Sequence, residues 1–95
     1  MQTGTKNVKR HSNARSLIEG KHIVILDRGF VYVGRCRKVG DMLRIDEAKN
    51  IRRWGTTNGI GELRNGPLAT TVLDVVGTVL APWHSVQHLI PCVGF

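Results

Sequence analysis

The chain has 95 residues, of which 41% are hydrophobic and 22% are charged. This is the composition of one small globular domain, and it excludes a wholly disordered or fibrous protein. A domain of this size has a modest core, so we expect any ligand site to be shallow or shared between subunits.

The charge is positive and uneven along the chain. Fourteen Lys and Arg residues stand against seven Asp and Glu, a formal net charge of +7. We divide the chain into a basic N-terminal arm, residues 1–19, and a single β-rich domain, residues 20–95. Such an arm suits contact with phosphates or with an acidic surface. A polar arm becomes ordered only when something holds it, so we expect it to clasp a neighbouring subunit. Its expected partner contacts are Lys6, Lys9, Arg10 and Arg15.

Three short strands joined by tight turns are expected first in the body. The runs at 22–26, 30–37 and 42–45 are rich in β-branched residues and are separated by Asp27-Arg28-Gly29 and Val39-Gly40-Asp41. Within the second run the side chains alternate, with Val31, Val33, Arg35 and Arg37 on one face. These features predict an antiparallel meander.

The second half of the body is predicted to form further short strands, a loop and a brief helix. We expect a fourth strand at 50–54, a flexible loop at 55–59 and one or two helical turns at 60–64. Strand candidates follow at 70–74, 77–80 and 86–90. The predicted fold class is α+β, mostly β: a small antiparallel β-barrel or sandwich of short strands, with one or two short helices and an extended N-terminal arm.

The chemistry expected of an enzyme is missing from the sequence. Cys36 and Cys92 form no CxxC pair and are expected to be buried thiols. His84 and His88 stand at i and i+4, but flanking prolines favour a strand over a metal-binding helix face. We therefore expect no catalytic activity, no metal and no cofactor. The N-terminus has no apolar leader, and no segment has the length and apolarity of a membrane span, so no membrane partner is expected.

The segment around the 55–59 loop carries the strongest indication of a ligand. Glycines allow backbone N–H groups to approach an anion, arginines pair with phosphate, and a tryptophan stacks on a base. The alternative is a loop with glycines at positive φ and a core tryptophan, with the two arginines on opposite strand faces. The expected anion-binding residues are Arg52, Arg53, Trp54, Thr56, Thr57 and Asn58.

The run Ala48-Lys49-Asn50-Ile51-Arg52-Arg53-Trp54-Gly55, with Ile60-Gly61-Glu62-Leu63 and a closing Ile90-Pro91-Cys92, resembles a family of small uncharacterised phage and prophage proteins. The resemblance covers about residues 21–93. It departs from the family pattern at Arg52, where an aromatic residue is common, and in the shorter segment between Leu63 and Thr70.

The resemblance implies a viral or prophage origin and a place in the host cytoplasm or the virion. We expect a non-enzymatic homo-oligomer, an accessory factor that binds an anionic, nucleotide-like ligand or a host protein. The first alternative is a structural virion protein, a decoration or connector subunit whose arm clasps its neighbours and other viral structural proteins. The second is a nucleic-acid-binding protein, for which the few aromatic residues are a weak basis.

Overall fold

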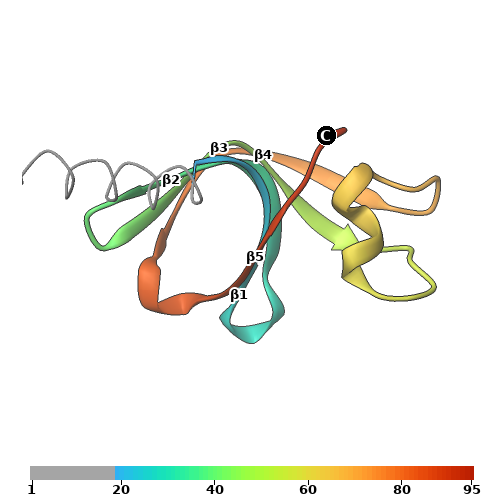
Figure 1. The fold of residues 1–95 in the computed structure, drawn as a ribbon, viewed down its shortest axis with the longest axis horizontal. Helices are drawn as coiled ribbons and strands as arrows, with labels where there is room; N and C mark the ends of the chain where they lie inside the picture. The colour runs from blue at the N-terminus through green and yellow to red at the C-terminus, as the bar shows by residue number, and fades with distance from the viewer. Residues whose placement is uncertain (1–18) are drawn as a thin grey trace, which may run out of the picture.

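The computed structural model describes residues 19–95, and their fold is mostly β (Figure 1). The strands are β1 (Gly20–Leu26), β2 (Val31–Val39), β3 (Met42–Arg53), β4 (Val72–Pro82) and β5 (Val86–Pro91). Three short 3₁₀ helices connect them: η1 (Asp27–Gly29), η2 (Ile60–Asn65) and η3 (Trp83–Ser85). The predicted β-rich class with brief helices is therefore confirmed.

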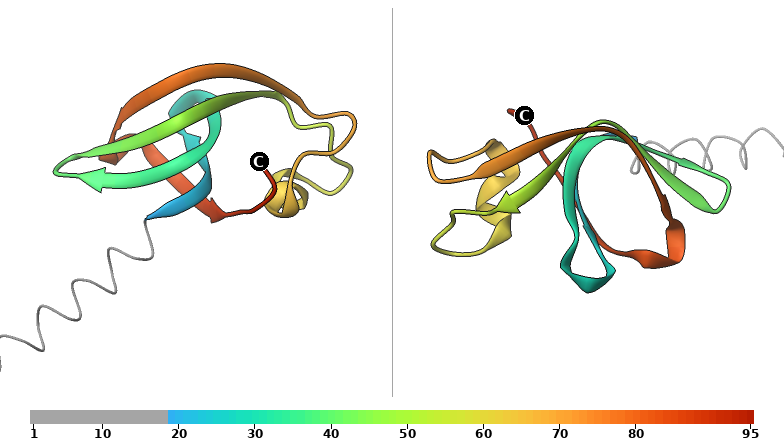
Figure 2. Two further views of the ribbon diagram at one scale, coloured as in Figure 1. Left: turned by 90° about the horizontal axis from the view of Figure 1, so that it is seen from above. Right: turned by 180° about the vertical axis from the view of Figure 1, so that it is seen from behind.

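All five strands belong to one antiparallel sheet with the order β4-β3-β2-β1-β5. The first four strands follow one another as a meander, and β5 returns to pair with β1 (Figure 2). The sheet curls strongly but does not pair β4 with β5, so a closed barrel is not confirmed. The described strands also form one sheet, not the two of a sandwich.

The predicted breaks inside the third and fourth strands are wrong. Residues 42–45 and 50–53 belong to the single strand β3, which ends one residue before Trp54. Residues 70–74 and 77–80 fall largely within the single strand β4. The charged segment between the halves of β3 does not turn the chain, because it forms a β-bulge. At Glu47 the backbone has φ of 53°, and the register of β3 shifts there against both neighbouring strands.

The two faces of the curled sheet each cover a group of buried side chains. The inner face holds one group: Val24, Cys36, Leu43, Ile45 and Ala48. The outer face holds the other: Ile23, Val31, Val33, Ile51, Leu63 and Cys92. Figure 1 shows η2 outside the curl, where its fully buried Leu63 packs on the outer face. Strand alternation predicts buried residues on both faces once each face is covered.

The predicted arm contacts Lys6, Lys9, Arg10 and Arg15 lie outside the described residues. Within residues 19–95, every helix is too short to cross a bilayer.

Candidate functional site

The loop predicted to bind an anion connects β3 to η2 and is fastened to the segment before β4. Thr70 Oγ1 donates a hydrogen bond of 2.6 Å to the carbonyl of Gly55, and Thr71 Oγ1 donates one of 2.7 Å to the carbonyl of Trp54. Gly55 has φ of 69°, and a Cβ there would lie 2.4 Å from the carbonyl oxygen of Thr70. Only glycine fits this position, because both the backbone conformation and the close approach exclude a side chain.

Two backbone donors of this loop are already satisfied within the chain. The N–H groups of Thr57 and Asn58 donate to the two carboxylate oxygens of Glu62, at 3.2 and 2.8 Å. A carboxylate from η2 thus takes the position that the sequence interpretation gave to a bound anion. Sequence reasoning missed Glu62, although it lies only four residues beyond Asn58.

The two arginines before the loop have different surroundings. Arg52 Nε lies 2.8 Å from Asp74 Oδ2 on β4, and this ion pair raises the pKa of the Arg52 guanidinium. Arg53 makes no ion pair with any residue that the structure describes. Trp54 is 40% exposed and Thr56 is half-buried. Of the predicted residues, Arg53 and Trp54 are therefore exposed, as are Thr57 and Asn58, whose backbone N–H groups are already bonded. Ligand binding at this loop stays a prediction.

A larger group of cations lies on the outer face of β1, β2 and β3. In the sheet register, Lys21 stands opposite Arg35, Arg37 opposite Arg44, and Val33 opposite Lys49. Residues directly opposite one another share a face, and alternation places all of these side chains on the face of Val33. We call this group the basic face; it consists of Lys21, Arg35, Arg37, Arg44 and Lys49.

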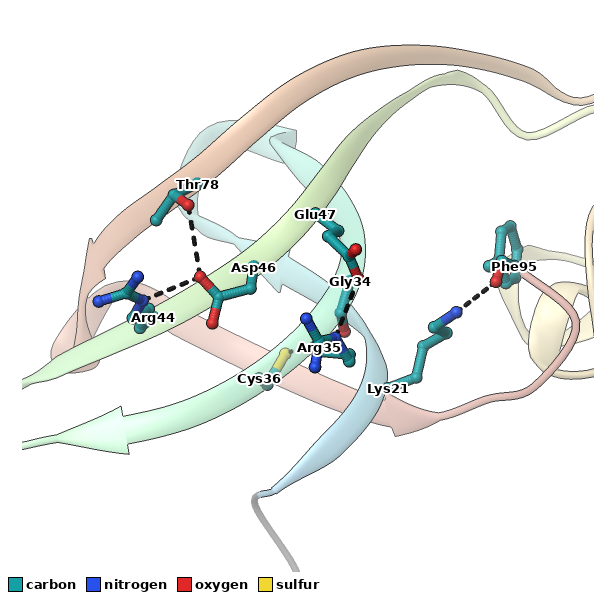
Figure 3. Close-up of polar contacts among 9 residues, drawn as sticks. All are labelled: Lys21, Gly34, Arg35, Cys36, Arg44, Asp46, Glu47, Thr78 and Phe95. Atoms are coloured by element: carbon teal, nitrogen blue, oxygen red, sulfur yellow. Dashed lines mark hydrogen bonds and ion pairs between the residues drawn. The ribbon is translucent and has the colours of Figure 1, made fainter.

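Carboxylates offset part of this charge (Figure 3). Arg35 Nε lies 3.0 Å from Glu47 Oε1, and Arg44 Nε lies 2.9 Å from Asp46 Oδ1. The hydrogen bond from Arg44, helped by Thr78, holds the pKa of the Asp46 carboxyl below its usual range. These pairs are solvent-exposed and contribute little to folding stability.

Arg37 is exposed and makes no ion pair within residues 19–95. Its cross-strand neighbour is Arg44, another arginine. Like charges directly opposite each other destabilise a sheet. Asp46 offsets the charge of Arg44, whereas the charge of Arg37 is left for a bound anion to offset.

Two shallow hollows lie on the basic face. One, of about 350 Å³, is lined by Gly20, Arg35, Arg37 and Asp46 among others. The other, of about 270 Å³, is lined by Lys21, Arg35, Lys49 and Phe95 among others. Lys21 Nζ also donates to the main-chain oxygen of Phe95, which ties the C-terminal segment to this face (Figure 3).

The two cysteines are buried free thiols, as the sequence predicts. Burial raises the pKa of Cys36 to about 12, and burial also raises the pKa of Cys92. A thiol that stays protonated at neutral pH is a poor nucleophile and a poor metal ligand.

The histidines do not form the helical pair that their spacing allows. His84 lies in η3 and His88 in β5, so they do not share one helix face. Among residues 19–95, no group of three or more His, Cys, Asp and Glu side chains could hold a metal ion. His22 is buried, with Nδ1 3.0 Å from the carbonyl oxygen of Gly20.

The sequence predicts only part of the basic face. Alternation in the second strand places Arg35 and Arg37 on one face. Lys21, Arg44 and Lys49 join them only through the pairing register, and the bulge at Glu47 shifts that register.

Comparison of the chain with protein-family models, with curated proteins and with solved structures finds no match. The resemblance to phage and prophage proteins therefore stays a prediction.

Proposed function

We propose that the protein is a non-enzymatic binding module for a polyanion, and that its basic face contacts the phosphodiester backbone of a nucleic acid. The observation that carries this proposal is the pairing of Arg37 with Arg44 in the sheet register, with Lys21, Arg35 and Lys49 on the same face. Five cations there outnumber the three nearby carboxylates, Glu19, Asp46 and Glu47.

The distribution of the cations favours an extended ligand over a single nucleotide. The five side chains are spread across three strands instead of converging on one cavity, and the hollows between them are shallow. A row of spaced cations matches the repeated charges of a nucleic acid backbone, and such contacts carry affinity without sequence specificity.

The basic N-terminal segment leads directly into the strand that begins beside the basic face. Gly20 begins β1 and lines the same hollow as Arg35 and Arg37. The four cations of the predicted arm precede Gly20 in the sequence, and no acidic residue lies among residues 1–18. Contacts from that segment would extend the same electrostatic attraction.

Arginine charge reversal tests the proposal. We expect the full chain to bind a short DNA duplex of mixed sequence in fluorescence anisotropy, with an affinity that falls steeply as salt rises. Arg37→Glu should weaken binding at least about tenfold and reduce the salt dependence. The matched control is Arg64→Glu on η2, an exposed arginine that is not part of the basic face and undergoes the same change of charge.

A third variant separates the basic face from the loop. If Arg53→Glu abolishes binding of a nucleotide in calorimetry while Arg37→Glu leaves it unchanged, the predicted loop site is the ligand site. The proposal is overturned if the wild type shows no salt-dependent DNA binding, or if Arg37→Glu and Arg64→Glu weaken binding equally.

We keep a structural virion protein as the alternative function. That function needs contacts between copies of the chain, and the observation that favours it is that β4, the outermost strand of the sheet, has one edge unpaired with any described strand.

A further inference from the structure

Strand β4 leaves one complete edge of the sheet unpaired. It is the outermost strand and bonds only to β3 among the described strands. Its C-terminal part, from Val79 to Pro82, pairs with β3 in regular register. An edge strand of this kind presents unpaired N–H and C=O groups that another strand can join.

The side chains on β4 lack the charges that usually protect an edge. Val75, Val76 and Leu80 are 84%, 48% and 60% exposed. The only charged residue in the strand is Asp74, which pairs with Arg52. The register of β4 shifts near Gly77, and Pro82 has no N–H to donate to a new partner, so the segment open to a partner is 77–81.

An apolar hollow of about 430 Å³ runs beside this segment. Its lining includes Val79, Leu80 and Pro82 from β4, and Leu26, Phe30 and Tyr32 from the β1–β2 hairpin. Phe30 is 54% exposed at the hairpin tip. The hollow leaves an apolar surface alongside the unpaired edge.

The charge distribution favours a second copy of the chain as the partner of the β4 edge. The chain has a net charge of +7, so two copies repel each other over most of their surfaces. Beyond Arg64, however, the sequence contains no Lys or Arg, and this part includes β4, η3 and β5. Residues 77–81 therefore bring no cation of their own to the contact, and Arg44, which stands opposite Leu80 on β3, is paired with Asp46. An acidic partner would instead be drawn to the basic face.

We propose that β4 pairs antiparallel with β4 of a second copy, through residues 77–81 and centred near Val79. The pairing is isologous, so one surface serves both copies and the assembly closes as a dimer. It places Leu80 of each copy near Thr78 of the other and adds five strands to five in a continuous sheet.

Light scattering of the full chain tests this interface. Over a range of concentrations we expect a mass of twice the 10.5 kDa of one chain. Leu80→Lys places a charge on the edge and should weaken dimerisation at least about tenfold. The matched control is Val93→Lys, which adds the same charge at a side chain that is 64% exposed outside β4 and should leave the dimer intact.

Hydrogen exchange gives a second readout that does not depend on mass. The amides of residues 77–81 that do not bond to β3 should exchange more slowly as the concentration of the wild type rises, and should lose this dependence in Leu80→Lys. A monomeric wild type, a Leu80→Lys variant that remains a dimer, or an assembly larger than a dimer overturns the proposal. DNA binding by the basic face is measured separately, and it should not weaken in Leu80→Lys, because the new lysine stands opposite Arg44 on β3.

Discussion

Gly34 of β2 lies against the bulge that β3 makes at Glu47. The bulge at Glu47 brings the backbone of β3 against Gly34, where a Cβ would lie 2.7 Å from the carbonyl oxygen of Asp46 and 2.7 Å from Ile45 Cγ2. Both atoms belong to packed parts of the structure and have little freedom to move. The absence of a side chain at residue 34 is therefore what allows β3 to carry its extra residue.

We expect Gly34→Ala to destabilise the fold by about 1–3 kcal/mol, because the added methyl group overpacks a rigid contact. The control is Gly61→Ala in η2, where a Cβ meets nothing within 4 Å and the change should stay within about 0.5 kcal/mol. Chemical denaturation of the two variants measures both values. Equal stabilities would show that the bulge can relax.

At the scale of elements, the segment between β3 and β4 is held by its own side chains. Thr70 and Thr71 bind the carbonyls of Gly55 and Trp54, and Glu62 binds the N–H groups of Thr57 and Asn58. These bonds replace a sheet or a long helix as the means of satisfying the loop backbone. Leu63 then anchors η2 in the outer core.

We expect Glu62→Ala to speed hydrogen exchange of the Thr57 and Asn58 amides at least about tenfold, because each loses its acceptor. Amide exchange followed by NMR measures this directly. Glu19→Ala, which removes an exposed carboxylate in front of β1, should leave both amides unchanged. If inorganic phosphate slows the exchange again in Glu62→Ala, the loop can hold an anion once its own carboxylate is removed.

At the scale of the whole molecule, the cations of the basic face and the exposed apolar edge lie on different strands of the sheet, which meet where Arg44 stands opposite Leu80. The basic face lies on β1, β2 and β3, whereas β4 presents Val75, Val76 and Leu80 without a lysine or arginine. This separation gives the two proposed interactions opposite electrostatics. One depends on attraction to an anion, and the other has to overcome repulsion between two positively charged copies.

We expect salt to act on them in opposite directions. Rising salt screens repulsion between copies and should strengthen the β4 dimer, and the same salt should weaken DNA binding. Sedimentation and anisotropy measured over one series of buffers compare the two. A dimer that weakens with salt would point to an interface made by charged side chains instead of β4.

Sequence features that involve only neighbouring residues were sufficient to predict the meander. The β-branched runs and the turns at residues 27–29 and 39–41 predict β1, β2 and the start of β3, because a hairpin depends on neighbouring residues. The loop and helical turn after β3 follow from glycines and a stop signal at Asn65-Gly66-Pro67 in the same way. The continuity of β3 was missed because the residues that permit it, Gly34 and Glu47, lie on different strands.

The sequence by itself determined the β-rich class, the alternation of β2, the burial of both thiols and the excess of positive charge. Each depends on composition or on the period of two along a strand. Only the tertiary structure decided which cations share a face, that Glu62 and Asp74 occupy the donors of the predicted anion site, and that β4 is left at an open edge. These features arise from register and strand order, which join residues distant in the chain and leave no local pattern.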